Sequence, residues 1–422
     1  MKQTAAVILA AGKGRRMRSD VPKALCQAAG RKMIEYLLDI SRFAGAAKTV
    51  VVGGYKIDML KKFLHGSGAE VIEQKRLLGS ADAVKQTAAC FKGFDGTIII
   101  LYTDTPLLKA STLKRMVKAH KGKNSDLTLL TAVVDDVKQY GRIMRDDSGC
   151  ICGITEFTQS KDAGAHRSAE INVGAYCFDA GKLFEGLNSI GKNFKKNEYY
   201  LTDIVEYFYK NKFKLQTCRV NDNEEALGVN SRQDLFTADR ILRRRMLDGL
   251  TGRRVTVIDR SNVYISDNVR IGSGTVIYPF VVIESGVKIG RDCKIGPFAN
   301  LRKGAVLKKG SQVGNFVEVT RSVIGENSRV KHHSYIGDTV IGKRANIGAG
   351  TITANYDGRT KSRTLIGDSA SIGSGTILVA PVKVGRGAVT GAGSVVVKGR
   401  DIPSNVTVAG VPARRLYKNK SN

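Results

Sequence analysis

"IESGVKIGRDCKIGPFANL" (residues 283–301) places a large aliphatic residue at every sixth position, at 283, 289, 295 and 301. The same period runs from Ile265 to Val319, and it resumes after one-residue slips at Ile324 and Ile341. Beyond an interruption at residues 354–363 it continues to Ile402. A repeat this short predicts a solenoid in which each hexad forms one short strand and its turn. Three hexads then make one triangular coil whose interior is filled by the aliphatic side chains.

The N-terminal part of the chain, 1–230, follows a different pattern, in which short apolar runs alternate with stretches that carry apolar residues at helical spacing. The apolar runs lie at residues 5–12, 48–54, 97–104 and 127–134. This alternation predicts βα units around a largely parallel sheet, with ligands at the carboxyl ends of the strands. We therefore expect an α/β domain at 1–230, a linker helix at 231–252, and the solenoid with a C-terminal tail at 253–422.

The formal net charge of +30 over 422 residues raises the question of a nucleic-acid partner. The dense basic run "RILRRRM" (240–246) has no interleaved aromatic residues, and no nucleic-acid-binding motif occurs. We therefore expect no specific nucleic-acid partner. The seven cysteines lack CxxC spacing, and no apolar run is long enough to span a bilayer, which predicts a cytoplasmic protein that does not insert into membranes.

A glycine-rich stretch, "LAAGKGRRM" (9–17), follows the first apolar run, and "PK" follows at 22–23. Glycines after a strand let backbone N–H groups face an anion, and Lys13, Arg16 and Lys23 add positive charge. The combination L-A-A-G-x-G-x-R-M and P-K resembles the sugar-1-phosphate nucleotidylyltransferases. Together with the hexapeptide half, the chain resembles the bacterial family of bifunctional N-acetylglucosamine-1-phosphate uridylyltransferase/glucosamine-1-phosphate N-acetyltransferases. This resemblance implies a Rossmann-like nucleotidyltransferase domain followed by a left-handed parallel β-helix of hexapeptide repeats.

For the first half the resemblance implies uridylyl transfer from UTP to N-acetylglucosamine-1-phosphate, with Mg²⁺ as cofactor. Arg16 and Lys23 are the implied catalytic cations, and Asp104 in "YTDTPLL" and Asn230 in "GVNSR" are the implied metal ligands. The implied UTP-binding residues are Leu9, Ala10, Gly12, Gly14, Lys23, Gln74, Gly79 and Ser80. The implied sugar-phosphate-binding residues are Gly141, Glu156, Asn172 and Asn230.

For the second half it implies acetyl transfer from acetyl-CoA to glucosamine-1-phosphate. The segment "SRVKHHSYIGD" (328–338) matches the family pattern and puts His332 at the catalytic base, with His333 as a bystander or a tuning neighbour. The implied sugar-phosphate-binding residues are Arg302, Tyr335 and Asn346, and the implied acetyl-CoA-binding residues are Asn355, Tyr356, Lys361, Ser374 and Ala392. In the family the inserted loop at 345–364 reaches a neighbouring subunit's site, which implies a homotrimer.

Several positions depart from the family pattern, notably Thr103 for Gly, Ser80 for Thr, Thr320 for Lys and Gly410 for Arg. A β-branched residue at 103 would be expected to crowd the nucleotide. An alternative is therefore that one activity only is retained, or that the protein is a related sugar-1-phosphate nucleotidylyltransferase with an altered substrate. A noncatalytic trimeric scaffold or nucleic-acid binder is favoured by the net charge alone.

Overall fold

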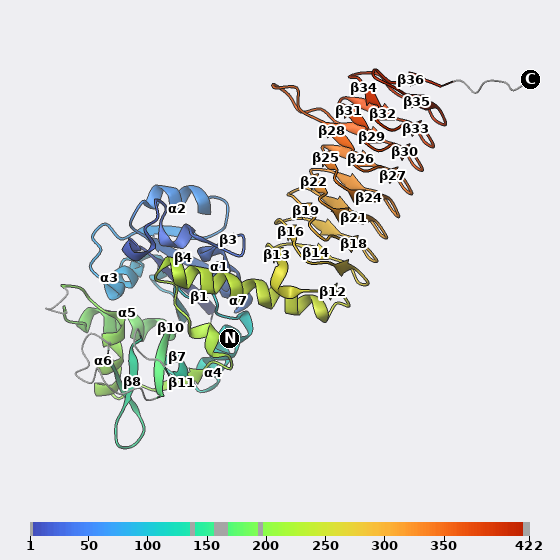
Figure 1. Ribbon diagram of the computed structural model, residues 1–422. Coiled ribbons are helices and arrows are strands. Elements are labelled where there is room, and N and C mark those ends of the chain that lie inside the picture. Colours follow the sequence, from blue (N-terminus) through green and yellow to red (C-terminus); the bar gives the residue numbers. More distant parts are fainter. Residues whose placement is uncertain (1–2, 136–139, 156–167, 193–196, 417–422) are drawn as a thin grey trace, which may run out of the picture. The chain divides into compact units, whose positions relative to one another are not determined.

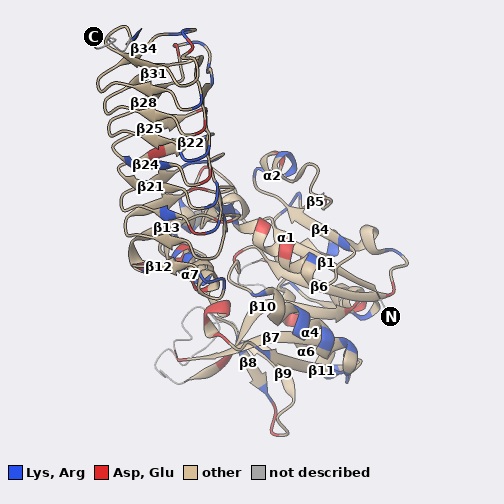
Figure 2. Ribbon diagram, turned by 90° about the vertical axis from the view of Figure 1, so that its right-hand side faces the viewer, with Lys and Arg blue, Asp and Glu red and all other residues tan. Residues whose placement is uncertain are grey.

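The computed structural model describes residues 3–135, 140–155, 168–192 and 197–416 of the chain (Figure 1). The chain divides into two compact units, Met1–Ile241 and Leu242–Asn422. The division falls inside helix α7 (Arg232–Thr251), which occupies the segment where the sequence predicts a linker helix. In Figure 2, Lys and Arg are spread along both units, with Asp and Glu among them. None of the described helices is long and apolar enough to cross a membrane.

Unit 1 is built on one mixed sheet with the strand order β11-β7-β10-β6-β1-β4-β5, to which the β8–β9 hairpin is attached through β10. The strands are β1 (Gln3–Ala10), β4 (Lys48–Gly53), β5 (Glu70–Glu73), β6 (Gly96–Tyr102), β7 (Leu127–Val134), β8 (Arg142–Arg145), β9 (Ile151–Thr155), β10 (Ala169–Asp179) and β11 (Leu215–Arg219). A separate small hairpin joins β2 (Gln27–Ala28) to β3 (Arg31–Lys32).

The prediction of a largely parallel sheet needs a correction. Strand β1 is parallel to β4 and β6, and β7 is parallel to β11, but β10 runs antiparallel to both β6 and β7. The physical reason is the connection: a parallel return needs a crossover, usually a helix, and the described residues between β7 and β10 form the β8–β9 hairpin and no helix.

Helices cover both faces of this sheet. The buried residues of α1 (Met33–Phe43), α2 (Ile57–Leu64) and α4 (Ala110–Gly122) pack on one face. Those of α3 (Ser80–Lys85), α5 (Ala180–Ser189) and α6 (Ile204–Lys210) pack on the other. The apolar strand residues between the two layers are almost completely buried, which explains why their sequences read as continuous apolar runs.

Unit 2 is the solenoid predicted by the period of six, and its short strands stack into three sheets, which form the left-handed parallel β-helix that the family resemblance implies. The first contains β12 (Thr256–Val257), β15 (Val276–Ile277), β18 (Lys294–Ile295), β21 (Gln312–Asn315), β24 (Arg329–His332), β27 (Asn346–Ile347), β30 (Ser371–Ile372), β33 (Val389–Thr390), β35 (Thr407–Ala409) and β36 (Arg414–Arg415). The second contains β13 (Val263–Ile265), β16 (Val281–Ile283), β19 (Asn300–Leu301), β22 (Glu318–Thr320), β25 (Tyr335–Gly337), β28 (Ile352–Ala354), β31 (Ile377–Val379) and β34 (Val395–Val396). The third contains β14 (Arg270–Ile271), β17 (Lys288–Ile289), β20 (Val306–Leu307), β23 (Val323–Ile324), β26 (Thr339–Ile341), β29 (Thr364–Ile366) and β32 (Val382–Val384).

The register of these sheets accounts for the irregularities of the repeat. Ile277 pairs with Ile295, which lies three full hexads further along the chain, whereas Leu307 pairs with Ile324, which lies one residue short of three hexads. Each slip in the sequence is therefore one coil shortened by a residue, and the aliphatic rows stay aligned inside the prism. The interruption enlarges one coil, as the pairing of Ile347 with Ile372 shows, and its extra residues form a loop that projects from the prism (Figure 1).

Candidate active sites

The first candidate site lies at the carboxyl ends of β1 and β6. These neighbouring parallel strands end at Ala10 and Tyr102, so the glycine-rich loop after β1 and the residues after β6 meet at one edge of the sheet. The backbone N–H of Thr103 donates to the carbonyl of Leu9 at 3.1 Å, which ties the two strand ends together. This edge is where α/β sheets bind ligands.

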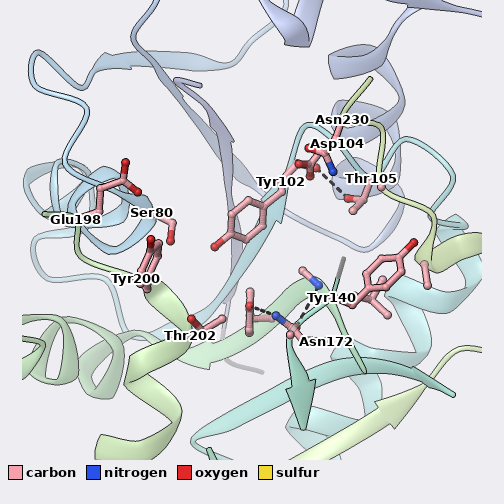
Figure 3. Close-up of a pocket in the computed structure, with 16 residues that line it drawn as sticks. Ser80, Tyr102, Asp104, Thr105, Tyr140, Asn172, Glu198, Tyr200, Thr202 and Asn230 are labelled. Atoms are coloured by element: carbon pink, nitrogen blue, oxygen red, sulfur yellow. Dashed lines mark hydrogen bonds between the residues drawn. The ribbon is translucent and has the colours of Figure 1, made fainter. Parts of the chain in front are cut away.

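Lys23, Asp104 and Asn230 converge at this edge from three distant parts of the chain. The Lys23 ammonium lies 3.0 Å from Asp104 Oδ2 and 2.8 Å from Asn230 Oδ1. Figure 3 shows Asp104 and Asn230 side by side. Two oxygens from different segments therefore already coordinate one positive charge, and carboxylate and amide oxygens suit Mg²⁺. The residues fit the implied metal site, with the lysine as a stand-in cation.

The start of α7 holds Asn230 in place. Asp234 Oδ2 accepts from the backbone N–H groups of Asn230 and Ser231 at 2.9 and 2.8 Å, and Ser231 Oγ accepts from the N–H of Asp234. This reciprocal pair is a capping box, which satisfies two N–H groups that a helix start leaves free. Arg232, the first residue of α7, donates to the carbonyls of Met17 and Arg18, so the same helix start also anchors the chain after the glycine-rich loop.

A pocket of about 610 Å³ opens beside this corner. Several predicted UTP-binding residues line it, together with Asp104: Leu9, Gly12, Lys23, Gln74, Gly79 and Ser80. Ser80 Oγ accepts from the N–H of Leu201 at 2.9 Å. Gly79 has a φ of +105°, and a Cβ there would lie 2.3 Å from the carbonyl oxygen of Tyr199, so this close approach requires glycine.

An adjoining pocket of about 360 Å³ is drawn in Figure 3, and it shares four residues with the first: Ser80, Tyr102, Asp104 and Glu198. Of the predicted sugar-phosphate residues, Gly141, Asn172 and Asn230 line it. Sequence reasoning missed the remaining polar and aromatic lining: Tyr102, Thr105, Tyr140, Tyr176, Glu198, Tyr200 and Thr202. The segment 197–203, "NEYYLTD", is rich in polar and aromatic residues outside any apolar run, and this composition was the available signal.

Three described residues predicted for the first half line neither pocket. Ala10 is buried at the end of β1, and Gly14 and the exposed Arg16 lie in the loop without lining either pocket. Gly14 has a φ of +57°, and its carbonyl accepts from the N–H of Met17. Glu156 lies outside the described residues.

The second candidate site lies along one corner of the β-helix, where the same turn of successive coils is stacked. The strand register places His332, Ala349, Ser374 and Ala392 at the same position of successive coils. Hydrogen bonds mark this column, because the N–H groups of Gly350, Gly375 and Gly393 donate to the carbonyls of His332, Ala349 and Ser374. Three predicted residues far apart in the sequence, His332, Ser374 and Ala392, thus form one line along the prism.

The next position of the same turn carries aromatic residues in the coils before His333 and glycines in the coils after it. In the preceding coils it carries Phe280, Phe298 and Phe316, whose rings stack with centroids 4.8 and 5.0 Å apart, and the imidazole of His333 stacks on Phe316 at 5.0 Å. In the following coils the same position carries Gly350, Gly375 and Gly393, each with positive φ. The stacked rings therefore end at His333, the chain neighbour of the predicted base His332, and a strip without side chains begins in the next coil.

Around the corner, Tyr335 and Asn355 gather over Gly337. A Cβ on Gly337 would lie 2.7 Å from Tyr335 Oη and 2.9 Å from Asn355 Nδ2, so glycine leaves room for both side chains. Asn355 donates to Asp338, and Arg321 binds the same carboxylate in bidentate fashion at 2.7 and 2.9 Å. These hydrogen bonds, that from Arg321 first, hold the pKa of Asp338 below its ordinary value.

The remaining predicted residues of this half are exposed. Arg302 donates to Glu318 at 2.8 Å, and Asn346 opens β27. Tyr356 and Lys361 form an antiparallel bridge inside the projecting loop.

The departures from the family pattern also have structural accounts. The hydroxyl of Thr103 donates to the carbonyl of Leu9 at 3.0 Å, which turns the side chain onto the end of β1. Thr320 is buried, and Arg321 beside it carries the exposed positive charge. Gly410 has a φ of +97°, a backbone conformation that favours glycine over arginine.

Comparisons with known proteins cover both halves. Residues 6–163 match the MobA-like NTP transferase domain, and residues 281–379 match the GMPPB C-terminal domain. A solved UDP-glucose pyrophosphorylase complexed with UDP-glucose matches 58% of this chain and 100% of its own, with 18% identity and a TM-score of 0.46, too distant to carry an argument.

Curated relatives named bifunctional protein GlmU match nearly end to end. That of Pelotomaculum thermopropionicum is 42% identical over 90% of both chains. That of Pelobacter propionicus is 39% identical over 96% of this chain and 95% of its own, and that of a Geobacillus species 38% identical over 99% and 96%. With this identity spanning both the α/β unit and the β-helix, the chain belongs to the GlmU family of bifunctional proteins.

Proposed function

We propose that the protein makes UDP-N-acetylglucosamine in two reactions. The β-helix acetylates glucosamine-1-phosphate with acetyl-CoA, and the α/β unit then transfers a uridylyl group from UTP to the N-acetylglucosamine-1-phosphate. The observation that carries the proposal is the corner at which Lys23, Asp104 and Asn230 meet, since it lies at strand ends and borders two adjoining pockets. The larger pocket suits the nucleotide, and the smaller one suits the sugar phosphate.

In uridylyl transfer, a phosphate oxygen of the sugar phosphate attacks the α-phosphorus of UTP. The bond from that phosphorus to the bridging oxygen breaks, and pyrophosphate leaves with the electron pair. Mg²⁺ held by Asp104 and Asn230 would supply a positive charge that lowers the cost of gathering the phosphates. Lys23 and Arg16 add their own charges, while the glycine-rich loop offers backbone N–H groups, so catalysis rests on positioning and electrostatics.

In acetyl transfer, the amine nitrogen attacks the thioester carbonyl, the carbon–sulfur bond breaks, and coenzyme A leaves as the thiol once its sulfur has received the proton that the amine loses. His332 is the group that takes up the amine proton. The column of His332, Ser374 and Ala392, next to the strip of bare glycines, offers a straight path for the thioester arm. Tyr335 and Asn355 would hold the sugar, and Arg302 its phosphate.

We also infer a homotrimer, in which the projecting loop of one subunit completes the acetyl-transfer site of the next. Tyr356 in this loop is 58% exposed, a large aromatic residue held out from the prism. Light scattering after size exclusion tests this point, and a mass near three times 45.7 kDa is expected. A monomer at assay concentrations would overturn it. A cytoplasmic location is proposed from the seven cysteines, all of which are free thiols.

The test of the proposed function supplies purified protein with Mg²⁺ and one of two substrate pairs: UTP with N-acetylglucosamine-1-phosphate, or acetyl-CoA with glucosamine-1-phosphate. Pyrophosphate release follows the first reaction, and thiol release follows the second. His332→Ala should abolish thiol release and spare pyrophosphate release, and Asp104→Ala should do the reverse. If either change lowers both rates equally in a folded protein, the assignment of separate sites is wrong.

The alternatives give different results in the same assays. Thiol without pyrophosphate would mean that the nucleotide half has changed its substrate, and pyrophosphate without thiol would mean the same of the β-helix. A nucleic-acid binder would show neither, and its DNA affinity would fall steeply with salt.

A further inference from the structure

The side chain of Gln74 has a single orientation available to its amide. Gln74 follows β5, is 4% exposed, and is held through its backbone N–H, which donates to Gly53 O at 2.8 Å. Its side-chain nitrogen Nε2 donates to the carbonyl of Gly79 at 3.0 Å and to Asp82 Oδ2 at 2.7 Å. A carbonyl and a carboxylate only accept hydrogen bonds, so the NH₂ group must face them.

This orientation turns the amide oxygen Oε1 of Gln74 toward the 610 Å³ pocket that the residue lines. No described residue donates a hydrogen bond to Oε1. The pocket wall therefore presents an acceptor that is open to a donor on a bound molecule.

Asp82 is itself held in place. It lies on α3, and its second carboxylate oxygen, Oδ1, accepts from Gln86 Nε2 at 3.2 Å. Gln86 therefore holds Asp82 from one helical turn away, and Asp82 in turn holds Gln74 through a side-chain hydrogen bond. Flipping the Gln74 amide would bring Oε1 against Asp82 and Gly79 O, placing three acceptors together without a proton between them.

We propose that Asp82 is a positioning residue that selects the nucleotide base by locking the amide of Gln74. The proposal rests on the proposed function, in which this pocket holds the base of UTP. Uracil carries a hydrogen on ring nitrogen N3, whereas N3 of cytosine carries a lone pair. A Gln74 amide fixed with its oxygen toward the pocket accepts a hydrogen bond from N3–H of uracil and repels the N3 lone pair of cytosine. The hydrogen bond to Asp82 prevents the amide flip that would accommodate cytosine.

The test compares UTP with CTP, which differ only at this edge of the base. In Asp82→Ala only the carbonyl of Gly79 still opposes the flip of the Gln74 amide, so the ratio of kcat/KM for UTP over CTP should fall about tenfold, the worth of one oriented hydrogen bond. The change should appear in KM, with kcat for UTP close to that of the unchanged protein. Asp82→Asn keeps one acceptor oxygen but also carries an NH₂ group that can donate to a flipped Gln74 amide, so its ratio should lie between those of the wild type and Asp82→Ala. Lys85→Ala, exposed on the same helix, is the matched control and should leave the ratio unchanged.

A double-mutant cycle separates positioning from a general structural effect. In a Gln74→Ala background, Asp82→Ala should have no further effect on the ratio, because nothing remains for Asp82 to orient. An unchanged ratio in a folded Asp82→Ala, or an equal fall in both backgrounds, would overturn the proposal. Direct titration with both nucleotides distinguishes a failure of the proposed function from a failure of this inference. Wild-type protein that binds neither overturns the proposed function and this inference together, whereas wild type and Asp82→Ala that prefer UTP equally overturn the inference alone.

Discussion

Replacing Lys23 with methionine is expected to tighten the binding of a divalent cation in the absence of nucleotide. The lysine ammonium lies within 3.0 Å of both proposed metal ligands, Asp104 and Asn230. A metal ion that binds these oxygens has to displace the ammonium. Methionine keeps an apolar stem of similar length and removes the competing charge.

The size of the effect follows from what the metal displaces. A hydrogen bond between charged groups contributes about 1.5–3 kcal/mol, and each 1.4 kcal/mol is a factor of ten. The side chains of Lys23 and Asp104 are 12% and 28% exposed, so water screens the pair only in part. The dissociation constant for Mn²⁺ should therefore fall about tenfold to a hundredfold. Pyrophosphate release should fall at the same time, because the lysine charge is lost from the phosphates.

Electron paramagnetic resonance of free Mn²⁺, titrated with protein and no UTP, measures the dissociation constant. Lys13→Met is the control, since Lys13 lines the same pocket, carries the same charge and has no described hydrogen bond to Asp104. Asp104→Asn should weaken binding. If Lys23→Met binds Mn²⁺ no more tightly than Lys13→Met does, the ammonium does not compete with the metal.

Three further predictions concern stability and the acetyl-transfer site. Burial lowers the pKa of His120 to about 4, so the unfolded chain takes up a proton below about pH 6.5 that the folded protein excludes. The free energy of unfolding should therefore fall by up to roughly 3 kcal/mol between about pH 6.5 and 4, and denaturant unfolding of His120→Gln should lack this part of the slope. Gly337→Ala should displace Tyr335 and Asn355 and raise the KM for glucosamine-1-phosphate at least about tenfold, with little change in melting temperature. Leu301→Ala, which empties a fully buried position of the β-helix, should cost about 2–5 kcal/mol in denaturant unfolding, and a loss below about 1 kcal/mol would contradict the stacked core.

The β-helix follows from the sequence because its signal is local and repeated. Each hexad carries its own buried aliphatic residue, and the sum of many weak preferences leaves one arrangement that buries them all. The slips at Ile324 and Ile341 are visible in the sequence, and the shortened coils absorb them. The apolar runs of the first half likewise predict β1, β4, β6 and β7, whereas β10 lies outside these runs and only the structure shows its direction.

The tertiary structure alone brings together residues whose spacing follows no period. Lys23 lies 81 residues from Asp104 and 207 residues from Asn230, and they meet because β1 and β6 are neighbours and α7 begins beside them. His332, Ser374 and Ala392 form one column only once the enlarged coil is taken into account. The lock of Asp82 on Gln74 depends on where a short helix packs. A sequence pattern reports which side chains are buried, whereas contacts between distant segments depend on strand order and helix packing, which burial alone does not determine.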